Sequence, residues 1–289
     1  MNKLSGIFTA LLTPFHPDGS VNVKELKRLV KLDLDLGAQG FYVCGTTAEA
    51  FFMTEEERRT VMETVRSAAP DVPLIAQIGS LDFRQAQSLA GYAGLLGYDA
   101  ISSVAPFYYK YTFAEISEYY RRLADAAGLR MLVYYFPASS GVTLSAEALT
   151  GLISDGGFAG MKFTCGDLFL METCKRALGD KTVLNGFDEI FLSGLCAGAD
   201  GGVGSTYNFM ADKFVAIRSL FLEGRIAEAK RIQSEVNRIV SVLLKVGVMQ
   251  GEKEILNQMG LDMGFCRPPF SELDPEAKRL IKEQIVDKL

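Results

Sequence analysis

The residue with the clearest chemical potential in this sequence is a lysine inside an apolar segment. Lys162 lies in Ala159-Gly160-Met161-Lys162-Phe163, where every other residue is apolar. Burying an ammonium group is costly, so a lysine in a buried strand is driven toward the neutral amine. A neutral amine can attack a ketone and form a Schiff base. A lysine that reaches solvent or pairs with a buried acid is the structural alternative, and the pattern leaves both open.

Tyr134 is a second candidate because it lies near the end of another apolar segment, Leu132-Val133-Tyr134-Tyr135-Phe136-Pro137. A phenol at the end of a strand can carry protons to and from a substrate if other hydroxyl groups hold it in place. Thr46, Thr47 and Tyr108 are residues that can supply this relay. A pair of core aromatic residues with satisfied hydroxyl groups is the more common interpretation of such a pattern.

Two glycine-containing segments can bind an anion. In Gly45-Thr46-Thr47-Ala48-Glu49, the glycine allows close approach of the backbone and the threonines add hydroxyl groups. The second segment, Gly201-Gly202-Val203-Gly204-Ser205, stands where many barrels bind phosphate. Tight packing of a strand also requires small residues, so this segment indicates a phosphosugar enzyme only weakly.

The remaining polar residues narrow the choice of chemistry. Asp188 and Glu189 can bind hydroxyl groups, although two acids at a helix start are more often structural. His16 is the only histidine, and the five cysteines form no C-x-x-C pair. We therefore expect no metal site, no hydrolase with a histidine base other than His16, and the reduced thiols of a cytoplasmic protein.

Composition excludes several classes of partner. The chain has 289 residues, of which 48% are hydrophobic, and a formal net charge of -5. It has no basic run, so nucleic acids and anionic membranes are not expected partners. No apolar run reaches the roughly 18 residues that a membrane helix needs.

Short β-branched or aromatic runs alternate with longer amphipathic stretches. The runs predict strands at residues 7–12, 40–44, 73–78, 100–104, 131–136, 159–163, 182–185 and 201–203. Helical spacing follows each run, and Thr54 with Glu57 forms the pattern of a capping box at one helix start. Strict alternation implies a parallel sheet covered by helices.

Eight such units predict a (β/α)8 TIM barrel, because open doubly wound sheets usually have about five or six strands. We expect a single domain over residues 1–289, with the barrel at about 1–222 and a C-terminal helical extension at about 223–289. The extension is expected to be helical throughout, with helices at 225–246 and 275–288 and a rigid connector at Arg267-Pro268-Pro269.

The active site of such a barrel lies at the C-terminal ends of its strands. Lysine, hydroxyl, acidic and glycine residues converge there, whereas the strand starts carry nothing comparable. The residues at these ends are Thr46, Thr47, Tyr108, Tyr134, Lys162, Thr164, Gly186, Asp188, Glu189 and Ser205.

At these positions the chain resembles the N-acetylneuraminate lyase and dihydrodipicolinate synthase superfamily. The resemblance runs nearly end to end and is specific as a set, although each motif alone is not. The motifs are Ala10-Leu11-Leu12-Thr13-Pro14-Phe15, Gly45-Thr46-Thr47-Ala48-Glu49, Ala105-Pro106-Phe107-Tyr108-Tyr109, Tyr134, Lys162 and residues 199–208.

Within the superfamily, the segments around Lys162 (Lys-Phe-Thr-Cys-Gly-Asp-Leu) and Asp188 (Asn-Gly-Phe-Asp-Glu) are similar to the sialic acid lyase branch. Ser139 stands where dihydrodipicolinate synthases carry an arginine for a second carboxylate, which disfavours a dicarboxylate substrate. Ala48, where that branch has glycine, and Tyr135, where it has asparagine or histidine, leave the exact sugar open.

The resemblance implies a class I aldolase that cleaves N-acetylneuraminate to pyruvate and N-acetylmannosamine without a cofactor. It implies that Lys162 forms the Schiff base, that Tyr134 transfers protons with Thr47 and a Tyr108 from a neighbouring subunit, and that the enzyme is a homotetramer. Substrate-binding residues would be Thr46, Thr47, Thr164, Gly186, Asp188, Glu189 and Ser205.

Other functions remain open at this point. One alternative is a related pyruvate-dependent aldolase for a 2-keto-3-deoxy sugar acid, or an enzyme like dihydrodipicolinate synthase. Another is a phosphosugar enzyme that uses the glycine-rich segment. A third is a barrel that binds a 2-oxo acid without turning it over.

Overall fold

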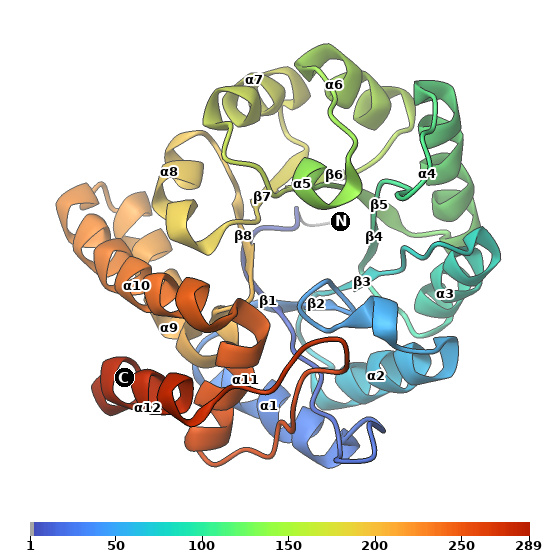
Figure 1. The fold of residues 1–289 in the computed structure, drawn as a ribbon. Helices are drawn as coiled ribbons and strands as arrows, with labels where there is room; N and C mark the ends of the chain where they lie inside the picture. Colours follow the sequence, from blue (N-terminus) through green and yellow to red (C-terminus); the bar gives the residue numbers. More distant parts are fainter. Residues whose placement is uncertain (1–2) are drawn as a thin grey trace.

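The structure is a computed structural model that describes residues 3–289, and its centre is a closed barrel of parallel strands (Figure 1). Each strand pairs with its neighbours in chain order, and β1 pairs with β8 to close the sheet. The strands are β1 (Gly6–Ala10), β2 (Gly40–Val43), β3 (Leu74–Gln77), β4 (Ala100–Val104), β5 (Arg130–Tyr135), β6 (Gly160–Phe163), β7 (Thr182–Asn185) and β8 (Gly201–Gly204). The predicted barrel is confirmed.

The strand predictions overlap all eight strands, and their ends differ from the structure by at most two residues. The largest difference is at the end of the first strand, which was expected to reach residue 12. The backbone N–H of Leu12 instead donates to Asn208 Oδ1 at 3.0 Å, and β1 ends at Ala10. Asn208 Nδ2 donates to the Ala10 carbonyl at 2.9 Å, so one side chain fixes this turn to the start of the last barrel helix.

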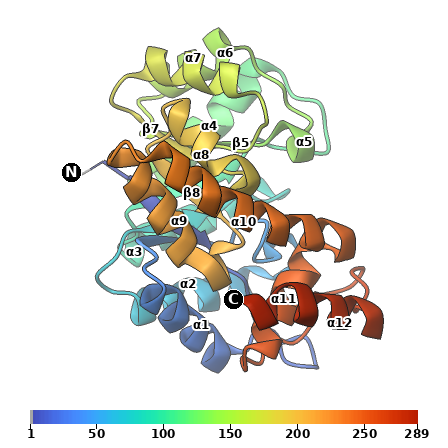
Figure 2. The same cartoon turned by 90° about the vertical axis from the view of Figure 1, so that its left-hand side faces the viewer.

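Helices cover the outside of the barrel, and shorter helical turns lie in the loops (Figures 1 and 2). The helices of the barrel are α1 (Val23–Asp35), α2 (Glu55–Ala68), α3 (Phe83–Leu95), α4 (Phe113–Ala127), α5 (Pro137–Ser140), α6 (Ala146–Asp155), α7 (Leu168–Leu178), α8 (Phe191–Cys196) and α9 (Tyr207–Leu222), with the turns η1 (Ala50–Phe52) and η2 (Asp188–Ile190). The capping box predicted for α2 is present, since Thr54 Oγ1 accepts from Glu57 N and Glu57 Oε2 accepts from Thr54 N.

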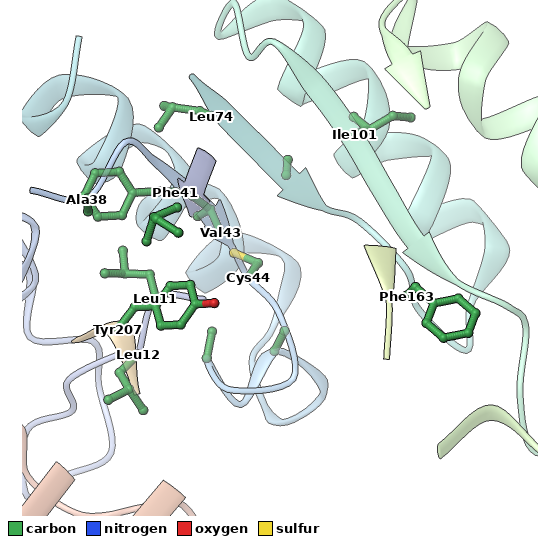
Figure 3. Packing of buried hydrophobic residues seen from close by; sticks show 14 of the residues in the cluster. Leu11, Leu12, Ala38, Phe41, Val43, Cys44, Leu74, Ile101, Phe163 and Tyr207 are labelled. Atoms are coloured by element: carbon green, nitrogen blue, oxygen red, sulfur yellow. The ribbon is translucent and has the colours of Figure 1, made fainter. Parts of the chain in front are cut away.

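Side chains along each strand alternate between the barrel interior and the surrounding helices. The outer cluster, part of which is drawn in Figure 3, includes Phe41, Val43 and Ile101. The interior cluster contains Leu4, Phe8, Ala10, Tyr42, Ile75, Ala100, Val104, Leu132, Tyr134, Leu184 and Val203. Met161 and Phe163 belong to the outer cluster, so the residue between them on β6 faces the interior.

The glycines of β8 are required by packing. A Cβ on Gly201 would lie 2.0 Å from the Gly6 carbonyl oxygen, and one on Gly204 would lie 2.1 Å from Asp188 Oδ1. Neither position can take a larger residue without displacing the neighbouring strand or a buried carboxylate. This close approach accounts for the glycine-rich segment and favours its structural interpretation over a phosphate loop.

The chain continues beyond the barrel in α10 (Ile226–Val246), α11 (Val248–Gln258), α12 (Pro275–Gln284) and η3 (Val286–Lys288). Figure 2 shows α10 running alongside the barrel toward the end at which α5 and α11 lie. No helix in residues 3–289 is both long and apolar enough to cross a membrane.

The expectation of a helical extension without interruption is wrong for residues 259–274, which form turns and loop. Gly260 and Gly264 adopt positive φ angles of 94° and 63°, which a helix does not accommodate. Pro268 and Pro269 lack the backbone N–H that a helix interior needs. The predicted helices at 225–246 and 275–288 are present, the second ending its regular turns at Gln284.

The core also contains a buried acid, Asp33 on α1, which is fully inaccessible to solvent. Burial raises the pKa of Asp33 well above its ordinary value of 3.8, and the Thr9 hydroxyl only partly opposes this. The parent protein therefore loses stability as the pH rises from the ordinary value toward the raised one, by up to about 1.4 kcal/mol per pH unit.

We predict that Asp33→Asn removes this loss because an amide does not titrate. The difference in free energy of unfolding, variant minus parent, should become more positive between about pH 5 and about pH 8, as measured by urea denaturation. The control is Asp35→Asn on the same helix, where the side chain is 61% exposed, and no such trend is expected. An equal difference at both pH values would show that Asp33 is already ionised in the folded state.

Candidate active site

Lys162 lies on the interior face of β6, near the C-terminal end of the barrel. Lys162 is 5% exposed, and no ion pair in residues 3–289 includes it. The Nζ atom lies 4.2 Å from the ring centroid of Tyr42 and 4.2 Å from that of Tyr134. The amine thus lies between two aromatic rings and lines a cavity, where it is accessible to a ligand.

Tyr134 is level with Lys162 across the sheet, because these two residues are register partners of β5 and β6. Its ring stacks on Phe136, with centroids 5.7 Å apart, and meets the Tyr42 ring edge-on at 5.9 Å. The Tyr42 hydroxyl donates to Ser102 Oγ at 3.0 Å, so Tyr42 is fixed from below. The phenol predicted from sequence therefore lies beside the predicted amine.

A cavity of about 330 Å³ opens above these residues. That volume suits a ligand the size of a sugar acid. Its walls combine the polar ends of the strands with an apolar surface from the C-terminal helices. The lining residues are Ala10, Thr46, Thr47, Tyr134, Phe136, Lys162, Thr164, Gly186, Phe187, Asp188, Glu189, Val203, Ser205, Thr206, Val240, Leu243, Leu244, Val248 and Met249.

The loop after β2 forms one wall and contains two of the predicted residues, Thr46 and Thr47. It is bracketed by Cys44 and Glu49, which have φ angles of 58° and 57°. Non-glycine residues rarely adopt such angles, and the cost is tolerated where the surrounding structure imposes it. The loop is therefore held in a strained conformation at the edge of the cavity.

A buried ion pair anchors one end of this loop. Glu49 Oε1 lies 2.7 Å from Lys253 Nζ, and the two side chains are 0% and 1% exposed. Glu49 Oε2 accepts the backbone N–H of Arg267 at 2.7 Å. Burial lowers the pKa of Lys253, although the charge of Glu49 opposes the shift. Glu49 is also the N-cap residue of η1, but its side chain makes no capping hydrogen bond and instead connects the loop to α11.

The opposite wall contains Asp188 and Glu189 in η2. Asp188 Oδ2 accepts hydrogen bonds from the backbone N–H of Thr206 at 2.9 Å and from its hydroxyl at 2.7 Å. Burial raises the pKa of Asp188 to about 6, and the bonds from Thr206 oppose that shift. From α10, Gln233 donates to the Asp188 carbonyl and Asn237 to the Glu189 carbonyl, both at 3.0 Å. Backbone contacts with α10 therefore hold this acidic pair.

Of the ten residues predicted from sequence, nine line the cavity and one does not. Tyr108, in the loop after β4, is 82% exposed and its ring packs edge-on against Tyr109 with centroids 5.0 Å apart. Its φ angle of 78° is the third positive value among non-glycine residues in the described part of the chain. Within this single chain Tyr108 does not line the cavity that contains Lys162.

The two departures that left the sugar open lie outside the cavity. Tyr135 faces the helices, where its ring packs against Phe163 with centroids 5.4 Å apart. Ala48 is 1% exposed and belongs to the outer cluster. Neither side chain lines the cavity, so neither contacts a ligand there directly.

The C-terminal helices contribute a part of the cavity that the sequence did not predict. Val240, Leu243 and Leu244 of α10 and Val248 and Met249 of α11 form its apolar wall. The available signal was the amphipathic pattern of α10, whose apolar residues continue to its C-terminal end. Among residues 3–289, no group of three or more His, Cys, Asp or Glu side chains is placed to hold a metal ion.

We predict that breaking the buried pair destabilises the protein. Glu49→Gln and Lys253→Met each leave one buried partner without its counter-charge, which typically costs about 3–5 kcal/mol. The double replacement should cost less than the sum of the two, and urea denaturation of all four proteins measures this. The exposed pair Lys31–Asp35, also 2.7 Å apart, is the control and should contribute little. Additive losses from the buried pair would contradict direct coupling.

Comparison with known proteins gives consistent matches over the whole chain. Residues 3–288 match the dihydrodipicolinate synthetase family. An N-acetylneuraminate lyase from Enterobacter sp. (strain 638) is 43% identical over 293 residues, covering 99% of each chain.

Solved structures agree with this result. CdNal from Clostridium difficile, solved in complex with mannosamine, superposes with a TM-score of 0.96 at 34% identity and covers 99% of both chains. The N-acetylneuraminate lyase from Fusobacterium nucleatum, complexed with pyruvate, has a TM-score of 0.92 at 36% identity, covering 97% of this chain and 95% of that one. The chain belongs to the dihydrodipicolinate synthetase family.

Proposed function

We propose that this protein is a class I aldolase that cleaves N-acetylneuraminate to pyruvate and N-acetylmannosamine. The observation that carries the proposal is the buried Lys162 amine, level with Tyr134 at the floor of a cavity with a polar wall. The similarity to named N-acetylneuraminate lyases supports it, as do the relatives solved with mannosamine and with pyruvate. Substrate and products are thus small molecules.

The first half of the reaction captures the ketone. Lys162 Nζ attacks C2 of the open-chain sugar acid, and loss of water gives a protonated imine. Thr46 and Thr47, with the backbone of their loop, bind the substrate carboxylate. The imine then withdraws electrons from C3, so no metal is needed to stabilise the developing charge.

The second half breaks the carbon–carbon bond. Tyr134, together with the substrate carboxylate, accepts the proton of the C4 hydroxyl. The C3–C4 bond breaks, its electron pair forms the enamine of pyruvate, and N-acetylmannosamine leaves. Protonation of the enamine at C3 and hydrolysis of the imine release pyruvate and regenerate the amine. Thr164 and Gly186 contact the reacting half, while Asp188, Glu189 and Ser205 bind hydroxyl groups of the sugar tail.

We further propose that the enzyme is a cytoplasmic homotetramer in which Tyr108 completes the site of a neighbouring subunit. The exposed position of Tyr108, with its strained backbone, supports a contact outside its own chain. The five cysteines are all unpaired, as expected in a reducing compartment. Sedimentation equilibrium and cell fractionation test the two parts separately, and a monomer with full activity would refute the role of Tyr108.

Trapping the imine tests the mechanism. Borohydride reduction in the presence of pyruvate should attach a three-carbon adduct to Lys162, located by mass mapping of peptides. Lys162→Arg should give no adduct and no cleavage. Tyr134→Phe should still form the adduct, because the amine is intact, but kcat should fall about 10²–10⁴-fold because proton transfer is lost.

The matched control is Lys181→Arg, a lysine whose amine donates to the Phe158 carbonyl outside the cavity. It should keep both the adduct and the activity. An unmodified Lys162 in an enzyme that still cleaves sialic acid would refute the Schiff base.

Asp188 gives a prediction about pH. Because its pKa is about 6, the carboxyl is neutral below that pH and becomes an acceptor for sugar hydroxyl groups above it. We expect kcat/KM for N-acetylneuraminate to rise from about pH 5 to about pH 7, and we expect Asp188→Asn to lose that rise.

Asp188→Ala separates the two aldolase functions. It should impair cleavage of N-acetylneuraminate more than cleavage of a shorter 2-keto-3-deoxy sugar acid. If cleavage of N-acetylneuraminate is unaffected and the shorter acid is the better substrate, the sugar acid aldolase replaces the sialic acid lyase.

A further inference from the structure

A carboxyl group with no assigned role lies directly behind the cavity. Glu252, on α11, is 0% exposed, and its Oε1 accepts a hydrogen bond from Ser205 Oγ at 2.6 Å. Its Oε2 has no hydrogen-bond partner in the described part of the chain. Ser205 lines the cavity, but Glu252 does not. The hydrogen bond to Ser205 therefore links Glu252 to the wall of the cavity.

We propose that Glu252 is a positioning residue that holds the hydrogen of the Ser205 hydroxyl away from the cavity, so that the oxygen accepts from the ligand and the sugar-tail wall selects substrates with hydroxyl donors. The inference rests on the proposed aldolase function, which it deepens by naming how the tail is recognised.

The direction of the hydrogen bond carries the argument. A serine hydroxyl has one hydrogen to donate and two lone pairs that accept. Because Glu252 Oε1 accepts the hydrogen of Ser205, as a carboxylate oxygen or as the carbonyl oxygen of the neutral acid, Ser205 offers only lone pairs to the cavity. Asp188 on the same wall is an acceptor as well once it is ionised. Two adjacent acceptors bind a polyol through its hydroxyl groups. When a deoxygenated tail binds instead, these acceptors of the protein stay unpaired, which is a strong basis for rejecting it.

The energetics argue against a purely structural role for Glu252. Burial raises the pKa of this carboxyl to about 8, and the Asp188 charge adds to that shift, while the bond from Ser205 opposes it. The titratable groups that face it from other elements are Asp188 in η2 and the Cys266 thiol after α11. A buried acid near another acid, with one oxygen unpaired, is costly, and an apolar residue of similar size is usually at least as stabilising.

Neighbouring residues of α11 divide the two walls between them. Lys253 contacts Glu49 behind the loop of Thr46 and Thr47, where the proposed mechanism places the substrate carboxylate. Glu252 contacts Ser205 at the wall proposed for the tail. Changes at Glu252 should therefore affect recognition of the sugar tail and leave the pyruvate half intact.

The test compares Glu252→Leu and Glu252→Gln with the parent enzyme. In Glu252→Leu the Ser205 hydroxyl rotates freely, and KM for N-acetylneuraminate should rise about fivefold, the effect of losing one oriented hydrogen bond. Its kcat should stay within about twofold, as should KM for a short 2-keto-3-deoxy acid without a tail. Glu252→Gln, whose amide oxygen accepts the same bond, should restore a KM near that of the parent.

Two further measurements separate positioning from structure. In a Ser205→Ala background, Glu252→Leu should change KM by less than about twofold, because there is no hydroxyl left to orient. Urea denaturation should show that Glu252→Leu is at least as stable as the parent. Equal KM increases with and without Ser205, or strong destabilisation, would overturn the positioning role.

Failure of this inference differs from failure of the proposed function. If the parent cleaves N-acetylneuraminate and Glu252→Leu leaves its KM unchanged, only the inference is overturned. If the parent forms the pyruvate adduct but cleaves no N-acetylneuraminate, the substrate assignment is overturned and the inference with it.

Discussion

The site depends on keeping one amine out of water without giving it a carboxylate partner. A buried ammonium normally finds such a partner, as Lys253 does in Glu49 at 2.7 Å. Lys162 instead contacts the rings of Tyr42 and Tyr134, which exclude solvent and stabilise a cation only modestly. The closed sheet makes this environment possible, because register places Tyr134 level with the lysine and alternation directs both side chains inward.

The helices that follow the barrel are part of the site, although they contribute none of the proposed reacting groups. α10 holds the backbone of η2 through Gln233 and Asn237. α11 reaches both walls, with Lys253 behind the strained loop after β2 and Glu252 behind Ser205. Because these contacts are buried side chains rather than surface pairs, small shifts of α11 would be transmitted to both walls at once. The barrel supplies the chemistry, and these helices fix its geometry.

Sequence patterns predicted the elements well where short-range rules apply. Short β-branched or aromatic runs, alternating with amphipathic stretches, located all eight strands, and nine of the ten predicted residues line one cavity. The patterns failed where a residue's role depends on a distant partner. Glu49 stands at a helix start, as a local pattern allows, but its side chain pairs with Lys253, 204 positions later, which no local pattern indicates. Tyr108 was implied by the resemblance, and it does not line the cavity of its own chain. The apolar wall from α10 and α11 was not predicted, because these helices follow the barrel in sequence and reach the cavity only through tertiary packing.

The crowding around β8 has a consequence for how this protein could evolve or be redesigned. A side chain on Gly201 would collide with the adjoining strand, and one on Gly204 would collide with Asp188. Neither glycine can therefore be replaced without disturbing the structure. The apolar wall from α10 and α11 is less restricted, because Leu244 is 67% exposed and Val248 and Met249 are half-buried, whereas Val240 and Leu243 belong to the core. New substrate preferences should therefore accumulate at the accessible residues of these two helices, while the strands stay unchanged. A library confined to Leu244, Val248 and Met249 would explore that freedom without changing a proposed reacting group.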